Sequence, residues 1–260
     1  MTWHPRVAAL DVDGTLVDQT NELSPAVRDA VLALAEAGVA IVVATGRAMP
    51  GTMEVVDRIG LEDGTAVTSN GAIVISYHPV EVLHSVTFDA SEAVRRVLEH
   101  VPDALVAVEE VGVGYRVNAP FPEGEVSGRI TIEDVDALVS EPVTRVVIRA
   151  PEHDAKEFAE VVEGLGLTET NYYIGYTSWL DLAPQGVSKA SGLELVCAKL
   201  DVAQADVLAV GDGFNDVEML EWAGRGVAMG QAPEHVQTAA DAVTGTVSDD
   251  GLAAELARYL

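Results

Sequence analysis

Short, nearly uninterrupted apolar runs alternate with helical patterns at both ends of this chain. The runs cover residues 7–10, 39–44 and 207–210. Between the first two, Ser24 begins a helix with apolar residues at every third or fourth position, and Gly38 ends it. Strands that are apolar throughout are buried on both faces. The alternation therefore predicts an α/β domain on a parallel sheet with right-handed crossovers.

The middle of the chain follows a different pattern. From about residue 78 to residue 179, helical patterns near 94–101 and 158–165 stand beside strand-like runs at 104–108 and 145–149. Glycine and proline are frequent between these runs, as in turns and loops. Helices and strands in this irregular order predict an α+β module inserted into the α/β domain.

Composition limits the partners of the chain. Its 260 residues are 48% hydrophobic, enough to bury a sizeable core. With 15 basic and 42 acidic residues the formal net charge is −27, which opposes binding to nucleic acid. The sequence has no signal-peptide pattern and no apolar run near the ~20 residues of a spanning helix, so we expect a cytoplasmic protein without a membrane partner. An anionic substrate would need a metal ion or a placed Lys or Arg at the site itself.

The strongest local signal follows the first apolar run. Asp11 and Asp13, with Gly14 and Thr15 next, stand at the carboxyl end of a strand, where parallel α/β sheets bind ligands. Carboxylates this close repel each other unless a proton or a cation lies between them. For oxygen ligands alone the natural cation is Mg²⁺. The alternative interpretation is a solvated turn, in which Asp and Gly are also common.

Three further segments fall at predicted strand ends or helix starts. Thr45 and Gly46 follow the second apolar run, and their hydroxyl and amide groups can donate to phosphoryl oxygens. Lys189 opens a helix in a chain poor in bases and could supply a cation. Asp212 and Asp216 follow the third run, among glycines that allow close approach of the backbone. Each segment alone is also consistent with an ordinary turn, a solvated lysine or a helix N-cap.

Together, in this order, the four segments resemble the four signature motifs of the haloacid dehalogenase superfamily. These are Asp-x-Asp-Gly-Thr-Leu, a Thr-Gly pair, a lone Lys and Gly-Asp-x-x-Asn-Asp. Their spacing is similar to that of the Cof-type phosphatases, whose cap domain lies between the second and third motifs. The segment Ser-Asn-Gly-Ala at residues 69–72 is a secondary match. The resemblance covers about residues 5–80 and 180–260, and over the cap it is only architectural.

The resemblance implies a fold and an activity. The expected architecture is a Rossmann-like parallel-sheet core of residues 1–78 and 182–260 with an α+β cap of residues 79–181. The expected enzyme is a Mg²⁺-dependent phosphatase of a small phosphorylated metabolite, such as a sugar phosphate, a nucleotide or a cofactor phosphate. Specificity should come from the cap, and the candidate anion contacts are Arg47, Arg116, Arg145 and Arg149.

The resemblance also implies roles for individual residues. Asp11 would be the nucleophile that forms an aspartyl-phosphate. Asp13 would protonate the leaving alcohol and then activate water. Mg²⁺ would be held by Asp11, by the main-chain carbonyl of Asp13 and by Asp212. Thr45, Gly46 and Lys189 would hold the phosphoryl oxygens, and Asn215 would contact the substrate or phosphate. Asp216 would orient Lys189 or metal-bound water, and Arg47 would also support the site.

Two alternatives use the same residues. A phosphotransferase or mutase would return the phosphoryl group to an alcohol instead of water. A phospho-receiver or binding module would hold the group without turnover. Asp13 and the large insert count against a receiver, because a receiver gains nothing from an acid–base group beside its nucleophile.

Overall fold

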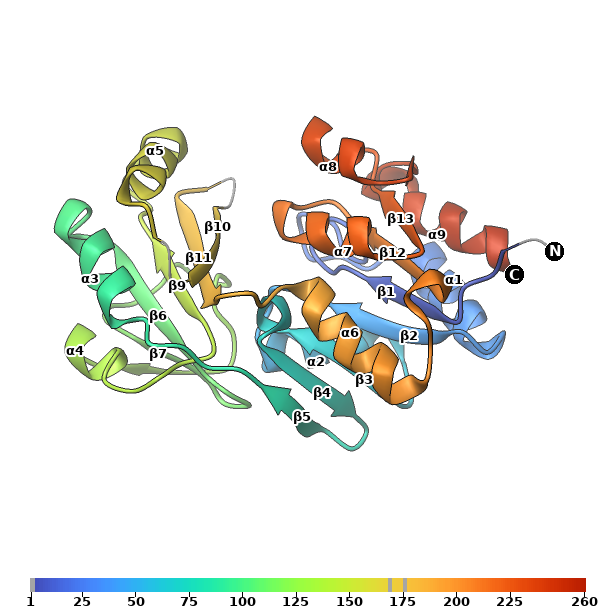
Figure 1. The fold of residues 1–260 in the computed structure, drawn as a ribbon, viewed down its shortest axis with the longest axis horizontal. Helices are drawn as coiled ribbons and strands as arrows, with labels where there is room; N and C mark the ends of the chain where they lie inside the picture. Colours follow the sequence, from blue (N-terminus) through green and yellow to red (C-terminus); the bar gives the residue numbers. More distant parts are fainter. Residues whose placement is uncertain (1–2, 168–169, 175–176) are drawn as a thin grey trace. The chain divides into compact units, whose positions relative to one another are not determined.

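The computed structural model describes residues 3–167, 170–174 and 177–260, and the chain divides into two compact units (Figure 1). The segments of the first unit are Met1–Gly46, Thr52–His84 and Ser188–Leu260, and those of the second are Arg47–Gly51 and Ser85–Val187. The second unit is therefore formed mainly by one long insertion into the first. The assignment of the units as catalytic core and cap, with boundaries at residues 78/79 and 181/182, stays a prediction.

The first unit is built on a mixed, largely parallel sheet. Its strands are β1 (Val7–Leu10), β2 (Ala40–Ala44), β3 (Gly64–Thr68), β4 (Ile73–Tyr77), β5 (Glu81–Ser85), β12 (Val207–Gly211), β13 (Arg225–Ala228) and β14 (Ala242–Val243). Their order is β14-β13-β12-β1-β2-β3-β4-β5. The strands from β14 to β3 are parallel, whereas β4 is antiparallel to β3. The predicted parallel α/β sheet is confirmed.

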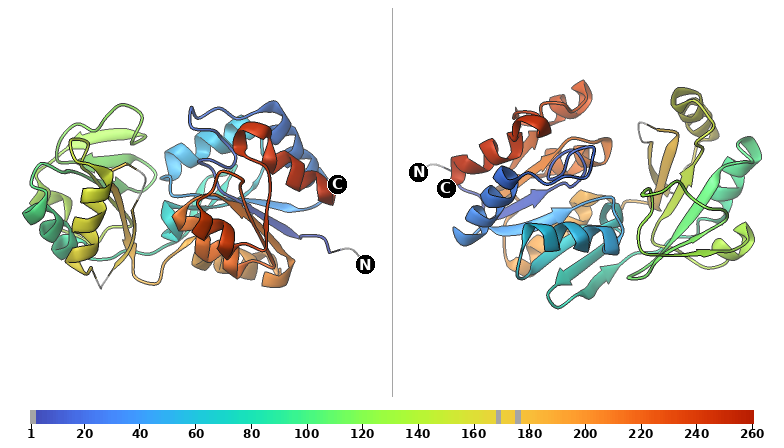
Figure 2. Two further views of the ribbon diagram at one scale, coloured as in Figure 1. Left: turned by 90° about the horizontal axis from the view of Figure 1, so that it is seen from above. Right: turned by 180° about the vertical axis from the view of Figure 1, so that it is seen from behind.

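Helices cover both faces of this sheet (Figure 2). They are α1 (Pro25–Glu36), α2 (Met49–Ile59), α6 (Lys189–Leu200), α7 (Val217–Trp222), α8 (Glu234–Ala239) and α9 (Gly251–Leu256). Leu193 of α6, Met219 of α7 and Val236 of α8 join the strands in one apolar core. Helices α1 and α9 pack against each other on the opposite face. Ser24 caps α1, as predicted: its Oγ accepts a hydrogen bond from the Val27 amide at 3.1 Å.

The second unit has a sheet covered by helices on one face. Its strands are β6 (Leu105–Glu110), β7 (Gly114–Val117), β8 (Arg129–Ile132), β9 (Val146–Arg149), β10 (Thr170–Ile174) and β11 (Trp179–Pro184), and its helices are α3 (Ser91–His100), α4 (Val135–Leu138) and α5 (Ala155–Leu165). The strand order is β10-β11-β9-β6-β7-β8, antiparallel except for the parallel pair β7–β8. The expected α+β character is confirmed.

Alternation along β9 separates the two faces of the second sheet. Val146 and Ile148 pack with Phe158 of α5 in the apolar core under the helices. Val147, between them, lies in a smaller cluster with Tyr115. Successive residues of a strand point to opposite faces, so the second cluster marks the face away from that core.

The glycine-rich stretch between residues 112 and 128 is not only a loop. Gly114 begins β7, and a Cβ there would lie 2.2 Å from the main-chain oxygen of Arg129 in β8. This glycine thus allows two strands to approach closely. The sequence analysis identified no strand in this stretch, because glycine marks turns and close strand contacts alike.

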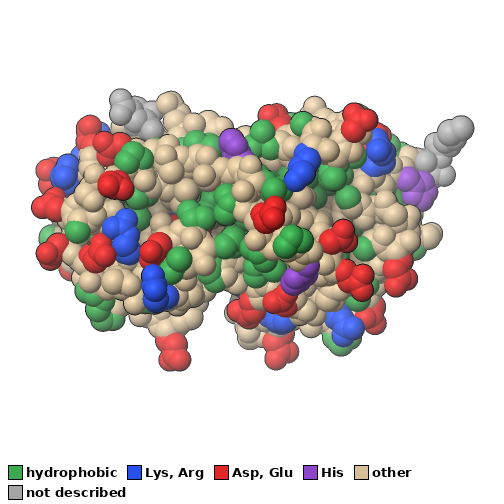
Figure 3. All heavy atoms as spheres, turned by 90° about the horizontal axis from the view of Figure 1, so that it is seen from below, with side chains coloured by type: hydrophobic (Ala, Val, Ile, Leu, Met, Phe, Trp, Pro, Cys, Tyr) green, Lys and Arg blue, Asp and Glu red, His purple; other side chains and the backbone are tan. Residues whose placement is uncertain are grey.

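Acidic side chains are spread over the surface. In the face shown in Figure 3, Asp and Glu are distributed over both units and do not gather in one patch. Among the residues that the structure describes, no helix has the length and apolar character needed to cross a membrane.

Candidate active site

The candidate site lies at the carboxyl ends of the central strands of the first unit. Asp11 follows β1, Thr45 follows β2, and Asp212 follows β12. Leu10, the last residue of β1, pairs with β2 on one side and with β12 on the other, so the strands end at a common level. Ligands bind at this edge of open parallel sheets. The fold therefore brings together motifs that are far apart along the chain.

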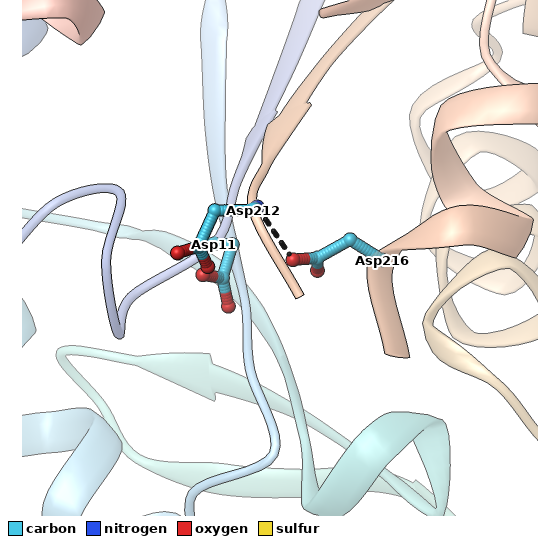
Figure 4. Close-up of side chains that lie close together, drawn as sticks. All are labelled: Asp11, Asp212 and Asp216. Atoms are coloured by element: carbon cyan, nitrogen blue, oxygen red, sulfur yellow. Dashed lines mark hydrogen bonds between the residues drawn. The ribbon is translucent and has the colours of Figure 1, made fainter. Parts of the chain in front are cut away.

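Three carboxylates converge at this edge (Figure 4). One carboxylate oxygen from each of Asp11, Asp212 and Asp216 lies within 4.8 Å of the other two. Asp11 is 4% exposed, and Asp216 is completely buried. In Figure 4 the carboxylates of Asp11 and Asp212 lie side by side, and that of Asp216 approaches from the 3-10 turn Phe214–Asp216, in the same segment after β12 that carries Asp212. A cluster this buried requires a compensating positive charge.

Lys189 supplies one positive charge. Its Nζ donates to Oδ1 of Asp11 and to Oδ1 of Asp216, each at 2.6 Å, and the side chain is 0% exposed. The residue begins α6 behind Ser188, which caps that helix. Burial lowers the pKa of Lys189, but the two carboxylates outweigh it and hold the pKa above its ordinary value. The ammonium group therefore stays charged at neutral pH.

The acidic groups are costly to ionise in the absence of a cation. Burial raises the pKa of Asp11 well above its ordinary value, and the Asp216 carboxylate raises it further, while Lys189 opposes the change. Burial likewise raises the pKa of Asp212 to about 6. If all three carboxylates were ionised, the one ammonium would leave two negative charges uncompensated, and the raised pKa values of Asp11 and Asp212 reflect the cost of that excess. A divalent cation would balance those charges.

The loop after β12 is held by Asp216. Its Oδ2 accepts hydrogen bonds from the amides of Asp212 at 2.9 Å and of Gly213 at 2.8 Å. Its Oδ1 is bound to Lys189. With both oxygens engaged inside the protein, Asp216 is placed to orient Lys189 and the Asp212 loop.

Gly14 and Gln231 fix the position of Asp212. Gly14 has a φ of +86°, and a Cβ there would lie 2.1 Å from Oδ2 of Asp212. The side-chain nitrogen of Gln231 donates to the Gly14 carbonyl at 2.6 Å and to Oδ2 of Asp212 at 3.1 Å. Sequence reasoning did not identify Gln231, whose only signal is its place just after the apolar segment that includes β13.

Asn70, to which sequence reasoning gave no role, lies beside Gly46. Asn215 donates through Nδ2 to Oδ1 of Asn70 at 2.8 Å. A Cβ on Gly46 would lie 3.0 Å from that oxygen and 3.4 Å from Nδ2 of Asn215. The amide of Asn70 also donates to the carbonyl of Thr45 at 3.1 Å. The available signal was the Ser-Asn-Gly-Ala match, which names a segment but no function.

The donor set fits a hard divalent cation. Asp11 and Asp212 present carboxylate oxygens, the ligands that Mg²⁺ prefers. The lack of a side chain at Gly14 leaves space for the Asp212 carboxylate, and the surplus of two negative charges matches the charge of the ion. The expected contribution of the Asp13 carbonyl stays a prediction. Asp13 itself is exposed and forms an isolated bridge with Val17.

The arginines of the second unit that were predicted to contact an anion form ion pairs with acidic residues of the same unit. Arg145 Nε lies 2.5 Å from Asp181 Oδ1, and both side chains are largely buried. The two other arginines are paired as well, Arg116 with Glu133 at 3.0 Å and Arg149 with Glu125 at 3.1 Å. Arg47 is half-buried and belongs to the second compact unit.

Comparison with known proteins identifies the class to which this fold and site belong. The family model of haloacid dehalogenase-like hydrolases matches residues 8–256. The chain therefore belongs to the haloacid dehalogenase-like hydrolases. The membership predicted from the motifs, in the Cof-type subgroup, is confirmed.

Individual relatives align over almost the whole chain. The pyridoxal phosphate phosphatase YbhA of Escherichia coli is 31% identical over 268 residues, covering 95% of this chain and 96% of that protein. A phosphoglycolate phosphatase of Haloarcula marismortui is 30% identical over 250 residues, covering 96% and 95%. Among solved structures, the phosphatase BT1666 of Bacteroides thetaiotaomicron is 30% identical with a TM-score of 0.80, covering 98% of this chain and 95% of that one.

Proposed function

We propose that this protein is a Mg²⁺-dependent phosphatase that hydrolyses a phosphate monoester of a small metabolite through an aspartyl-phosphate on Asp11. The observation that carries the proposal is the buried array in which Lys189 joins Asp11 and Asp216 beside Asp212. A structural role would not require four charged groups at the ligand-binding edge of the sheet. The phosphatases among its relatives support the same chemistry.

The charges at the site solve the main difficulty of the reaction. A carboxylate cannot approach a phosphate dianion unless charge is neutralised. The ammonium of Lys189 lies against the nucleophilic carboxylate and can bind phosphoryl oxygens next to it. Asp11 and Asp212, with the main-chain carbonyl of Asp13, would hold Mg²⁺, which would neutralise further charge on the phosphoryl oxygens.

The reaction then divides into two displacements. A carboxylate oxygen of Asp11 attacks phosphorus, the bond from phosphorus to the ester oxygen breaks, and Asp13 donates a proton to the leaving alcohol. Next, Asp13 takes a proton from water as the water oxygen attacks the same phosphorus. The bond from phosphorus to Asp11 breaks, and inorganic phosphate leaves. The exposure of Asp13 suits a group that must exchange protons with substrate and water.

The phosphoryl group is the part of the substrate that this site recognises. The two relatives at 30% and 31% identity act, by their names, on phosphoglycolate and on pyridoxal phosphate. These two substrates share little besides the phosphate ester. We therefore propose a small phosphorylated metabolite as the substrate class, with selectivity supplied outside the described carboxylate cluster.

The test is release of inorganic phosphate from p-nitrophenyl phosphate and a panel of metabolite esters, with Mg²⁺ and with EDTA. Asp11→Asn should lower turnover by ~10³-fold or more. Asp201→Asn, an aspartate at the exposed end of α6, is the matched control and should keep wild-type turnover. Adding a second alcohol distinguishes transfer from hydrolysis. Wild-type turnover by Asp11→Asn, or a single phosphoryl group retained without release, would refute the proposal.

A further inference from the structure

We propose that Asn70 is a further substrate-positioning residue, whose side-chain N–H donates to a phosphoryl oxygen beside Gly46 while its oxygen holds Asn215. This inference rests on the proposed phosphatase function. It concerns a residue outside the four motifs, on the short 3-10 turn Ser69–Gly71 that follows β3.

The backbone of this turn is strained. Ser69, Asn70 and Gly71 have φ values of 52°, 54° and 98° in succession. Left-handed backbone is unfavourable for residues other than glycine, although asparagine tolerates it better than most. Such strain persists where surrounding contacts fix the segment, and it is concentrated at functional sites.

Contacts with two motifs fix the turn. The amide of Asn70 donates to the carbonyl of Thr45 at 3.1 Å. On the other side, a Cβ at Gly71 would lie 2.0 Å from the main-chain oxygen of Ser188, the residue before Lys189. The turn is therefore wedged between the Thr-Gly segment and the start of α6. A displacement of the turn would disturb both.

The carboxamide of Asn70 adds a contact with a third motif. The side chain is 1% exposed, and its Oδ1 accepts the hydrogen bond from Asn215 at 2.8 Å. Its Nδ2 lies at the other end of the group, 3.3 Å from the place of a Cβ on Gly46. Because Gly46 has no side chain, this amide borders the space beside the Gly46 backbone.

A neutral donor suits this position. The carboxylates of Asp11, Asp212 and Asp216 exceed the charge of Lys189, so a further carboxylate would repel a phosphate dianion. An amide N–H can bind a phosphoryl oxygen without adding negative charge, and a donor already fixed by the fold needs no reorganisation during the reaction. Asn70 is thereby suited to recognise the same group as Lys189 and Asn215.

The experiment compares two substitutions at this position. Asn70→Gly removes the carboxamide and suits the left-handed backbone. Asn70→Asp keeps an oxygen for Asn215 but removes the N–H. Each variant is assayed for kcat and KM with p-nitrophenyl phosphate, for the inhibition constant of inorganic phosphate, and for its thermal midpoint. The matched control is Asn21→Gly, an exposed asparagine with a φ of 62° outside the site.

Both Asn70 variants should raise the inhibition constant of phosphate and lower kcat/KM by ~10- to 10²-fold, as expected for loss of a donor to a charged oxygen. The thermal midpoint of Asn70→Gly should stay close to that of the wild type, because relief of the left-handed backbone offsets the lost hydrogen bond, whereas Asn70→Asp buries a carboxylate and should lower the midpoint. Asn21→Gly should match the wild type in every measurement. If Asn70→Asp binds phosphate and turns over like the wild type, the N–H makes no such contact and the inference is wrong. If the wild type releases no phosphate from any ester, the proposed function fails first.

Discussion

Replacing Gly14 by alanine tests how the Asp212 carboxylate is positioned. The added Cβ would lie 2.1 Å from Oδ2 of Asp212, where ordinary contacts begin near 3.4 Å. Gly38 offers a matched position, because its φ is +92° against +86° at Gly14, and a Cβ there would meet no described atom within 4 Å. Both substitutions impose a left-handed conformation on alanine, at a cost of about 1–2 kcal/mol. Only Gly14→Ala also displaces a carboxylate.

The displacement sets the expected magnitude. Relieving the contact requires Oδ2 of Asp212 to move by about 1 Å, and a misplacement of this size in an active site costs ~10²-fold in rate. We expect Gly14→Ala to lower kcat/KM by ~10²-fold and to raise the Mg²⁺ concentration for half-maximal activity by ~10-fold or more. Gly38→Ala should lose a similar amount of stability and keep both kinetic values.

The assay is phosphate release from p-nitrophenyl phosphate over a Mg²⁺ titration, with thermal midpoints measured in parallel. The difference between the two variants isolates the effect on Asp212 from the backbone cost that they share. If Gly14→Ala and Gly38→Ala have the same Mg²⁺ dependence and the same kcat/KM, the close approach of Gly14 does not position the metal ligand, and the reasoning is refuted.

Three further predictions concern charge. Because burial raises the pKa of Asp212 from 3.8 to about 6, the folded protein holds this proton more tightly than the unfolded chain. In the absence of metal, its free energy of unfolding should therefore fall by about 2 kcal/mol between pH 4 and pH 6.5, measured by urea titration in EDTA, and Mg²⁺ or Asp212→Asn should reduce the fall. Asp216→Asn should cost about 3 kcal/mol and lower kcat by ~10²-fold, because Lys189 loses one of its two partners; unchanged kinetics would contradict this. Arg145→Met should destabilise the fold by about 3 kcal/mol by leaving Asp181 unpaired, and adding Asp181→Asn should recover part of the loss in the same titration.

Much of the first unit could be predicted because its signals are local. Uninterrupted apolar runs at residues 7–10 and 207–210 identify buried parallel strands, and Ser24 is a strong helix cap. Polar residues directly after such strands must lie at one edge of the sheet. The convergence of Asp11 and Asp212 was therefore predictable, because each directly follows a predicted buried strand.

The second unit was less predictable. The sequence indicated α3, α5, β6 and β9, which carry regular apolar patterns, but not β7 or β8. Every residue of β8 is exposed, so its sequence has no buried face to reveal it. The burial of Arg145 was not predictable from its charged side chain. It depends on an ion pair with Asp181, which is distant along the chain.

The sequence by itself determined the order of the elements, the family and the residue types available for phosphoryl chemistry, since these depend on short segments. Only the tertiary structure decided that Asp216 binds Lys189 and two loop amides, that Gln231 braces Asp212, and that Asn70 meets Asn215 beside Gly46. The physical reason is that such contacts join residues up to 217 positions apart, as for Gln231 and Gly14. No local pattern records a partnership that exists only after the strands have paired and the loops at their ends have packed.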